Sequence, residues 1–103
     1  MLLTASVGGV PIRLTDERWK HITARHPELR GQQGKVLETI RRPDEVRRGD
    51  FGENLAVRFY RRTPVTSKHL VVPYKEITET DGFVLTAYFA ARVPEWREQL
   101  WKR

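Results

Sequence analysis

The chain has 103 residues, of which 39% are hydrophobic and 31% charged, the size and balance of one globular domain rather than of a disordered segment. Cysteine is absent, which excludes disulfides, cysteine-ligated zinc and thiol catalysis. The sequence shows no secretory signal and no apolar run of the roughly 18 residues needed to cross a membrane. We therefore expect residues 1–103 to form a single domain in the cytoplasm, without membrane contact.

The net charge of +6 is carried mainly by arginine, which supplies fourteen of the nineteen basic residues. A guanidinium group is planar and can bind two phosphate oxygens at once. We therefore expect RNA as a partner. A basic surface that serves solubility alone is the alternative.

The N-terminal quarter predicts a β-hairpin followed by a helix. Two apolar arms, residues 2–7 and 10–14, flank a pair of glycines, which is typical of tight hairpin loops. Thr15 is a favourable N-cap, and the two acidic residues after it lie where the helix dipole favours negative charge. Pro27 disfavours a helical residue before it, so we expect the helix to end at about His26.

A second helix is predicted over residues 35–42, and alternating strands follow it. Pro43 ends this helix. Further along, Pro73 interrupts one of the alternating segments, which indicates an edge strand or a bulge. The strands are predicted around residues 55–62, 69–75 and 83–92, with turns at 49–54, 63–68 and 78–82.

The closing segment predicts a short C-terminal helix, because Pro94 suits a first helical position and Trp96 and Leu100 are four residues apart. Helices followed by hairpin-linked strands indicate an α+β fold, with N-terminal helices packed on a four-stranded or slightly larger antiparallel sheet. The alternation predicts that the helices cover Leu55, Val57, Phe59, Phe83, Leu85 and Phe89. The opposite, exposed face would then carry Arg58, Tyr60, Thr86, Tyr88 and Arg92.

The first predicted helix carries the strongest functional signal. His21 and Arg25 lie one turn apart on a polar stripe that also includes Arg18, whereas His26 lies on the apolar side. His21 is therefore the leading candidate for an acid or base, with an ordinary surface histidine as the alternative. His26 is either a partly buried structural imidazole or a second proton carrier.

These residue types suit the cleavage of RNA without a metal. The 2′-hydroxyl must lose a proton, the leaving oxygen must gain one, and a fixed cation must offset charge on the phosphate. Imidazole transfers protons near neutral pH, arginine binds the phosphate, and tyrosine donates a proton or stacks on a base. The candidate catalytic residues are His21, Arg25, His26, Thr86 and Tyr88, and the candidate RNA-binding residues are Arg18, Arg58, Tyr60, Arg62, Lys75 and Arg92.

A metal site is the competing interpretation of the histidines. His21 and His26 are five residues apart, so they diverge around a helix by about 140° instead of sharing a face. His69 is the only other imidazole, and the acids within residues 44–50 are expected to be solvated. We therefore expect neither a metal nor a cofactor.

Paired arginines add to the positive charge in the middle of the chain. Such pairs are usually part of a solvated surface. If they lie on one side of the sheet, they form a channel for nucleic acid with a strong salt dependence. The pairs are Arg41-Arg42, Arg47-Arg48 and Arg61-Arg62.

Several of these segments together resemble a known family. The pattern comprises Leu14-Thr15, Arg18-Trp19, His21-Ile22, Arg25-His26-Pro27-Glu28-Leu29, Val36-Leu37-Glu38-Thr39-Ile40, Pro43-Asp44 and Phe83-Val84-Leu85-Thr86-Ala87-Tyr88. It is similar to the phage-associated barnase–EndoU–colicin–RelE-like nuclease domains, from about residue 14 to residue 92. The resemblance implies a metal-independent ribonuclease with helices on a four-stranded antiparallel sheet, and it points to His21, Arg25, His26, Thr86 and Tyr88. It also implies a toxin-like role restrained by a cognate inhibitor or antitoxin protein.

Two functions therefore stand side by side. The first is a small endoribonuclease that uses 2′-hydroxyl attack and leaves a cyclic phosphate. The alternative is a non-catalytic RNA-binding or protein-interaction domain of the same fold, which needs the same cations and aromatic rings but no paired proton carriers.

Overall fold

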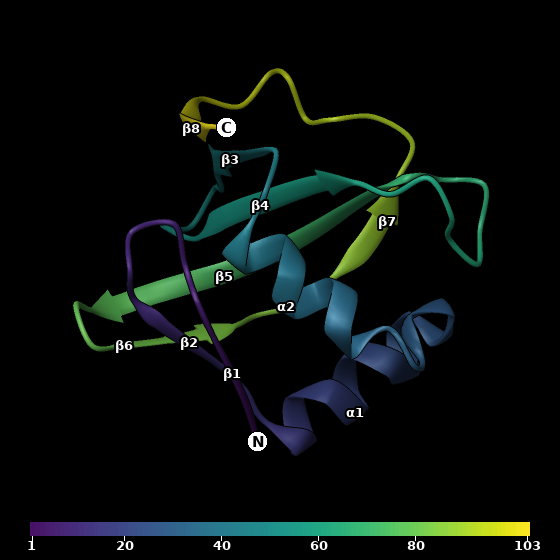
Figure 1. Ribbon diagram of the computed structural model, residues 1–103, viewed down its shortest axis with the longest axis horizontal. Coiled ribbons are helices and arrows are strands. Elements are labelled where there is room, and N and C mark those ends of the chain that lie inside the picture. The colour runs from purple at the N-terminus through teal and green to yellow at the C-terminus, as the bar shows by residue number, and fades with distance from the viewer.

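All 103 residues are described by a computed structural model, in which eight strands and two α-helices confirm the α+β class (Figure 1). Both helices lie in the N-terminal half. In chain order the elements are β1 (Leu2–Ala5), β2 (Pro11–Leu14), α1 (Asp16–Arg25), the 3-10 turn η1 (Pro27–Leu29), α2 (Gln33–Arg41), β3 (Glu45–Arg48), β4 (Asn54–Phe59), β5 (His69–Thr78), β6 (Asp81–Val84), β7 (Tyr88–Ala90) and β8 (Gln99–Lys102).

The strands form one mixed sheet, which is larger than the predicted four-stranded antiparallel one. Its order is β1-β2-β6-β5-β4-β3-β8, and β7 pairs with β5. The pairing of β2 with β6 is parallel, and every other pairing is antiparallel. The prediction missed β3 because its sequence, Glu-Val-Arg-Arg, contains one apolar residue and therefore gives no alternating pattern.

The predicted C-terminal helix is wrong, since this part of the chain forms turns and then strand β8. Trp96 is 80% exposed, so its spacing from Leu100 does not reflect a packed helical pair. Trp101 instead pairs with Val46 of β3. A helix of one or two turns is marginal by itself, whereas β8 satisfies the backbone groups along the outer edge of β3.

The hairpin and helix boundaries agree closely with the predictions. Residues 6–10, rather than two glycines alone, connect β1 to β2, and Gly9 within this turn has a φ of 82° that favours glycine. Thr15 caps α1 by accepting a hydrogen bond from the Arg18 backbone N–H at 3.1 Å. The helix ends at Arg25 and leaves His26 as its C-cap, directly before Pro27.

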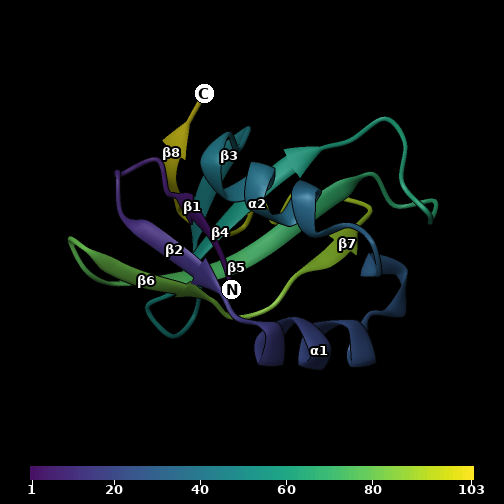
Figure 2. The same ribbon diagram turned by 60° about the horizontal axis from the view of Figure 1, so that its bottom comes forward.

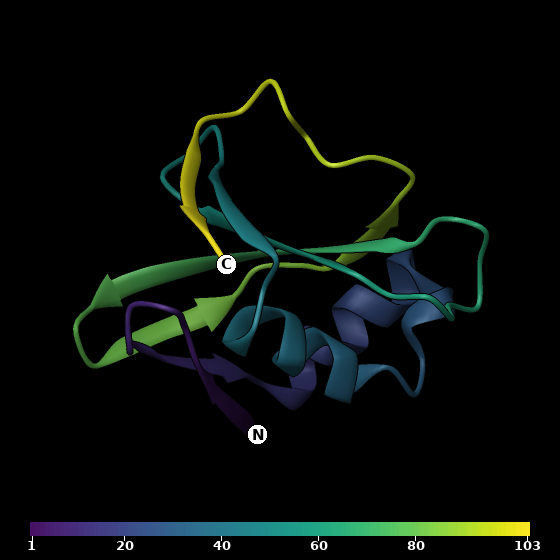
Figure 3. The same cartoon turned by 45° about the horizontal axis from the view of Figure 1, so that its top comes forward.

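The helices and the segment before β8 lie on opposite sides of the sheet. Figure 3 shows α1 and α2 on one side and residues 91–98, here called the C-terminal segment, on the other. Helix α2 packs on β1, β4 and β5, while α1 lies beside the β6–β7 edge (Figure 2). The main core between the helices and the sheet contains Val10, Ile12, Leu14, Ile22, Leu29, Val36, Ile40, Ala56, Leu70, Val72, Tyr74, Val84 and Ala87.

The predicted faces of β4 are reversed in the structure. Ala56 faces the helices, whereas Leu55 and Val57 lie on the other face, where Val93 of the C-terminal segment packs on them. Alternation did not distinguish the faces because three consecutive residues, 55–57, are all buried. The C-terminal segment creates this second small core, and the sequence pattern of β4 alone does not reveal it.

Pro73 divides the predicted last strand into β6 and β7. It lies in the middle of β5 and has no N–H to donate, and its carbonyl accepts from the N–H groups of Leu85 and Thr86 at 2.9 and 3.4 Å. Tyr74 pairs with Val84 and Leu70 pairs with Phe89, so five steps along β6–β7 match four steps along β5. This extra residue acts as a bulge and reverses which side chains face the helices after residue 84.

Candidate active site

His26 and Tyr88 are the two predicted catalytic residues that the structure brings together. Their ring centroids are 6.3 Å apart, with an angle of 35° between the ring planes. His26 is held at the end of α1, where its N–H donates to the Ile22 carbonyl at 2.8 Å. Tyr88 comes from β7, on the face opposite α2, because of the bulge beside Pro73. Both side chains remain partly exposed.

Glu28 lies beside the imidazole of His26. Its Oε1 lies 3.6 Å from His26 Nδ1, within ion-pair range. At this distance the contact is electrostatic and is not a hydrogen bond. Glu28 was not among the predicted site residues, although the short turn that begins at Pro27 brings it near His26.

The phenol of Tyr88 is protonated at neutral pH. Partial burial is the main cause that raises its pKa above the ordinary value of 10, while the charge of Arg97 lowers it and that of Glu53 raises it. Neither the Tyr88 hydroxyl nor the His26 ring forms a hydrogen bond within the protein. Both groups are therefore free to exchange protons with a bound molecule.

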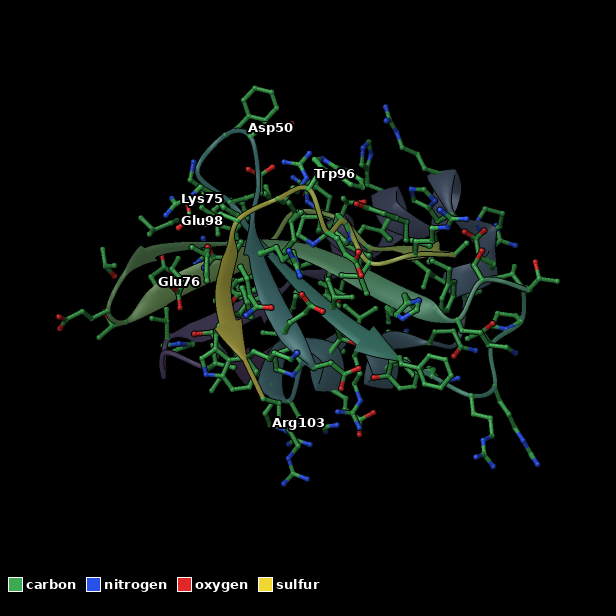
Figure 4. The ribbon with its side chains drawn as sticks, turned by 90° about the horizontal axis from the view of Figure 1, so that it is seen from above. Asp50, Lys75, Glu76, Trp96, Glu98 and Arg103 are labelled. Atoms are coloured by element: carbon green, nitrogen blue, oxygen red, sulfur yellow. The ribbon has the colours of Figure 1, made fainter.

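Arg97 and Asp50 form a clamp near Tyr88 that sequence reasoning missed. Arg97 Nη1 and Nη2 lie 2.8 and 3.0 Å from Asp50 Oδ1 and Oδ2. This hydrogen bonding lowers the pKa of Asp50 and raises that of Arg97. Asp50 lies in the β3–β4 turn, close to Trp96 on the C-terminal segment (Figure 4). Asp50 was expected to be solvated, and no local pattern indicated a partner so far along the chain.

The β3 arginines hold the rest of the C-terminal segment. Arg47 donates to the carbonyls of Glu95 and Arg97 at 3.1 and 2.7 Å. Arg48 pairs with Glu98 at 3.0 Å. This arginine pair is therefore engaged by the protein itself.

His21 and Arg25 are exposed on α1, and no described contact joins them to Tyr88. His21 borders an open depression that Arg18 and Lys20 also line. A neighbouring depression shares Arg18 and includes Phe83 of β6. The polar stripe of α1 thus borders the sheet face on which Phe83 lies, although Phe83 was predicted to face the helices. His21 is not the histidine that meets the strand tyrosine.

Arg58 and Tyr60 do not belong to this face, contrary to the prediction. The Tyr60 hydroxyl contacts the Lys35 carbonyl at 3.1 Å and Glu38 Oε1 at 2.9 Å, both on α2. Burial raises the pKa of Tyr60 well above its ordinary value. Arg58 donates to the Arg42 carbonyl at 2.5 Å. Both side chains therefore fasten α2 to β4, because the faces of β4 are the reverse of those predicted.

The remaining candidates are dispersed. Thr86 is partly exposed and uses its backbone N–H on Pro73. The side chains of Arg62, Lys75 and Arg92 are exposed, and none of them forms an ion pair. Nothing gathers these four residues around His26 and Tyr88.

No three His, Asp or Glu side chains come together as a group able to hold a metal ion. Neither α1 nor α2 has the length and hydrophobicity needed to cross a membrane. Comparison with family models, with curated proteins and with solved structures yields no match to this chain.

Proposed function

We propose that the protein is a metal-independent endoribonuclease centred on His26 and Tyr88. The observation that carries this proposal is the pairing of an imidazole and a protonated phenol, both partly exposed and both without a hydrogen bond inside the protein. Two such groups, contributed by different elements, are what a reaction with one proton abstraction and one proton donation needs. The resemblance to the nuclease domains motivates the same activity.

In the proposed reaction His26 Nε2 takes the proton of the 2′-hydroxyl, whose oxygen attacks the adjacent phosphorus. The bond from phosphorus to the 5′-oxygen breaks, and Tyr88 gives its proton to that oxygen, so the products are a 2′,3′-cyclic phosphate and a 5′-hydroxyl. Imidazole is suited to the first step because one ring nitrogen can accept a proton while the other keeps its own. The raised pKa of Tyr88 keeps the phenol protonated for the second step.

Arg25 is the cation that we assign to the phosphate. It directly precedes His26, is exposed and has no carboxylate partner. Arg97 is nearer to Tyr88 in its electrostatic effect, but Asp50 already neutralises its charge. Arg97 is therefore better suited to holding the C-terminal segment beside the site than to binding substrate.

The alternative is a non-catalytic RNA-binding domain. The net charge of +6 and the many unpaired arginines favour it, because phosphate contacts alone give affinity without turnover. Such a domain has no need for a histidine beside a tyrosine. A toxin-like role with an inhibitor protein follows from the resemblance alone.

The deciding experiment uses a DNA oligonucleotide that contains one ribonucleotide, incubated with the protein in excess EDTA. We expect cleavage only after the ribonucleotide, with a cyclic phosphate detected by mass spectrometry, and no cleavage of the all-DNA strand. His26→Ala and Tyr88→Phe should each lower the rate by about 10²–10⁴. Cleavage of the all-DNA strand, or a larger loss in His21→Ala than in His26→Ala, would contradict the proposed mechanism. Binding without cleavage by the unaltered protein would leave the non-catalytic alternative.

A further inference from the structure

A row of basic side chains, exposed except for the partly buried Lys35 and Arg58, lies on the helix side of the sheet, away from the Tyr88 face. Residues 35–42 and 58–62 contain six basic residues and one acidic residue, Glu38. Glu38 pairs with Arg58. The other basic residues of the row are Lys35, Arg41, Arg42, Arg61 and Arg62, and none of them forms an ion pair.

Hydrogen bonds from side chains to backbone carbonyls show that the two halves of this row lie side by side. Arg58 Nη1 donates to the Arg42 carbonyl at one end of α2, and Lys35 Nζ donates to the Arg62 carbonyl at 3.2 Å at the other end. The chain after β4 therefore runs beside α2 in the opposite direction. The row is about 10 Å long, since seven helical residues rise by about 1.5 Å each. Of the arginine pairs seen in the sequence, Arg41-Arg42 and Arg61-Arg62 lie at opposite ends of this row, whereas Arg47-Arg48 holds the C-terminal segment.

The row covers the aromatic ring of Tyr60 with positive charge. The ring of Tyr60 lies beneath it, with Lys35 Nζ and the Arg58 guanidinium each 5.6 Å from the ring centroid. The Tyr60 hydroxyl is fully engaged with α2. The ring of Tyr60 is therefore covered by cations and is not free for a base to stack on.

We propose that this basic row, defined by Lys35, Arg41, Arg42, Arg61 and Arg62, is a second RNA-binding surface that holds the phosphate backbone independently of base sequence. The proposal rests on the proposed function for the choice of RNA among polyanions. Residues 26–32, which contain η1, connect the end of α1 at His26 to the start of α2 near Lys35. An RNA strand that follows this short connection touches both the row and the catalytic pair. The row thus favours long RNA over short fragments.

The test measures the binding of a fluorescent single-stranded 20-mer RNA of mixed sequence between 0.05 and 0.5 M salt, in a His26→Ala background that prevents cleavage. In Arg42→Gln/Arg62→Gln, two lost phosphate contacts should reduce the log–log salt slope by about 1.4 and weaken binding about tenfold at 0.15 M salt. The matched control, Arg48→Gln/Lys102→Gln, also lowers the net charge by two but alters exposed positions on β3 and β8. It should bind nearly as the parent does.

Equal weakening in both double variants would overturn the proposal, because overall charge would then explain the binding. So would unchanged binding in Arg42→Gln/Arg62→Gln, or displacement of the RNA by polyglutamate of equal charge, which would indicate an acidic protein partner. Circular dichroism melts check that both variants are folded, as expected for exposed positions.

Cleavage of a dinucleotide, which is too short to reach the row, separates this proposal from the proposed function. If Arg42→Gln/Arg62→Gln with His26 intact cleaves the dinucleotide at the normal rate and loses affinity for the 20-mer, both proposals stand. If the unaltered protein cleaves neither substrate while the row variant loses affinity, the nuclease proposal fails and the row stands.

Discussion

Replacing Tyr60 with phenylalanine removes one hydroxyl and leaves the ring in place. In the structure this hydroxyl lies 2.9 Å from Glu38 Oε1, 3.1 Å from the Lys35 carbonyl and 3.1 Å from Thr39 Oγ1. A hydrogen bond contributes about 1 kcal/mol to stability, and one to a charged group about 1.5–3 kcal/mol. Because the Glu38 side chain is 40% exposed and keeps Arg58, water offsets part of the loss. We expect the free energy of unfolding to fall by about 1–2 kcal/mol.

Tyr88→Phe is the matched variant. It removes the same atom from a hydroxyl without a partner in the protein, so its stability should change by less than about 0.5 kcal/mol while RNA cleavage is lost. Urea denaturation followed by tryptophan fluorescence measures both changes, and the slope with denaturant should stay constant. Our reasoning is refuted if the two variants lose equal stability, or if Tyr60→Phe abolishes cleavage as Tyr88→Phe does. Loss of cleavage in Tyr60→Phe would mean that Tyr60 lies on the substrate surface, as the sequence pattern predicted.

Three further predictions concern the scaffold. Burial raises the pKa of Tyr74 to about 12, so the folded state keeps a proton that the unfolded state loses above pH 10. The free energy of unfolding should therefore fall between pH 10 and 12. Measured by urea denaturation at a series of pH values, this fall should be shallower in Tyr74→Phe than in the unaltered protein, by up to about 1.4 kcal/mol per pH unit. An equal fall in the two proteins would contradict this. A Cβ at Gly82 would lie 2.5 Å from both Ile12 Cδ1 and the Lys75 carbonyl oxygen, so Gly82→Ala should cost about 1–3 kcal/mol in thermal melts. Its control, Gly34→Ala in α2, meets open space and should stabilise by about 0.5–1 kcal/mol. Arg97→Met removes the clamp on Asp50 and should speed tryptic cleavage after Arg92 at low salt, with a smaller difference at 0.5 M salt where the exposed pair is screened. Equal cleavage rates at low salt would show that the clamp does not restrain the C-terminal segment.

Local signals in the sequence predicted the N-terminal half well. Thr15 and Pro27 act through their immediate neighbours, so the limits of α1 could be derived without knowing the rest of the fold. The hairpin before α1 has the same local origin. Its parallel pairing to β6 joins distant segments, and no residue of β2 indicates that neighbour.

The candidate site was predictable in its residues but not in its arrangement. His26 and Tyr88 were both identified, yet His21 was ranked first because it lies on the polar stripe. Strand β7 determines which histidine has a partner, and its phase depends on the bulge beside Pro73. The clamp between Asp50 and Arg97 depends on β8 pairing with β3, which a sequence that favoured a C-terminal helix could not reveal.

The surplus residue opposite Pro73 makes the proposed catalytic surface sensitive to the length of the chain rather than only to its composition. Deleting Leu85 removes the bulge and leaves Tyr88 on its present face, because four steps from Val84 to Phe89 then match four steps along β5. Inserting one residue between Val84 and Tyr88, with the bulge kept, shifts the pairing by one step, so that Tyr88 turns inward and Phe89 outward with no change to either side chain. A single-residue insertion near this position is thus a mutation by which the sheet loses the phenol beside the imidazole. A survey restricted to substitutions would overlook it.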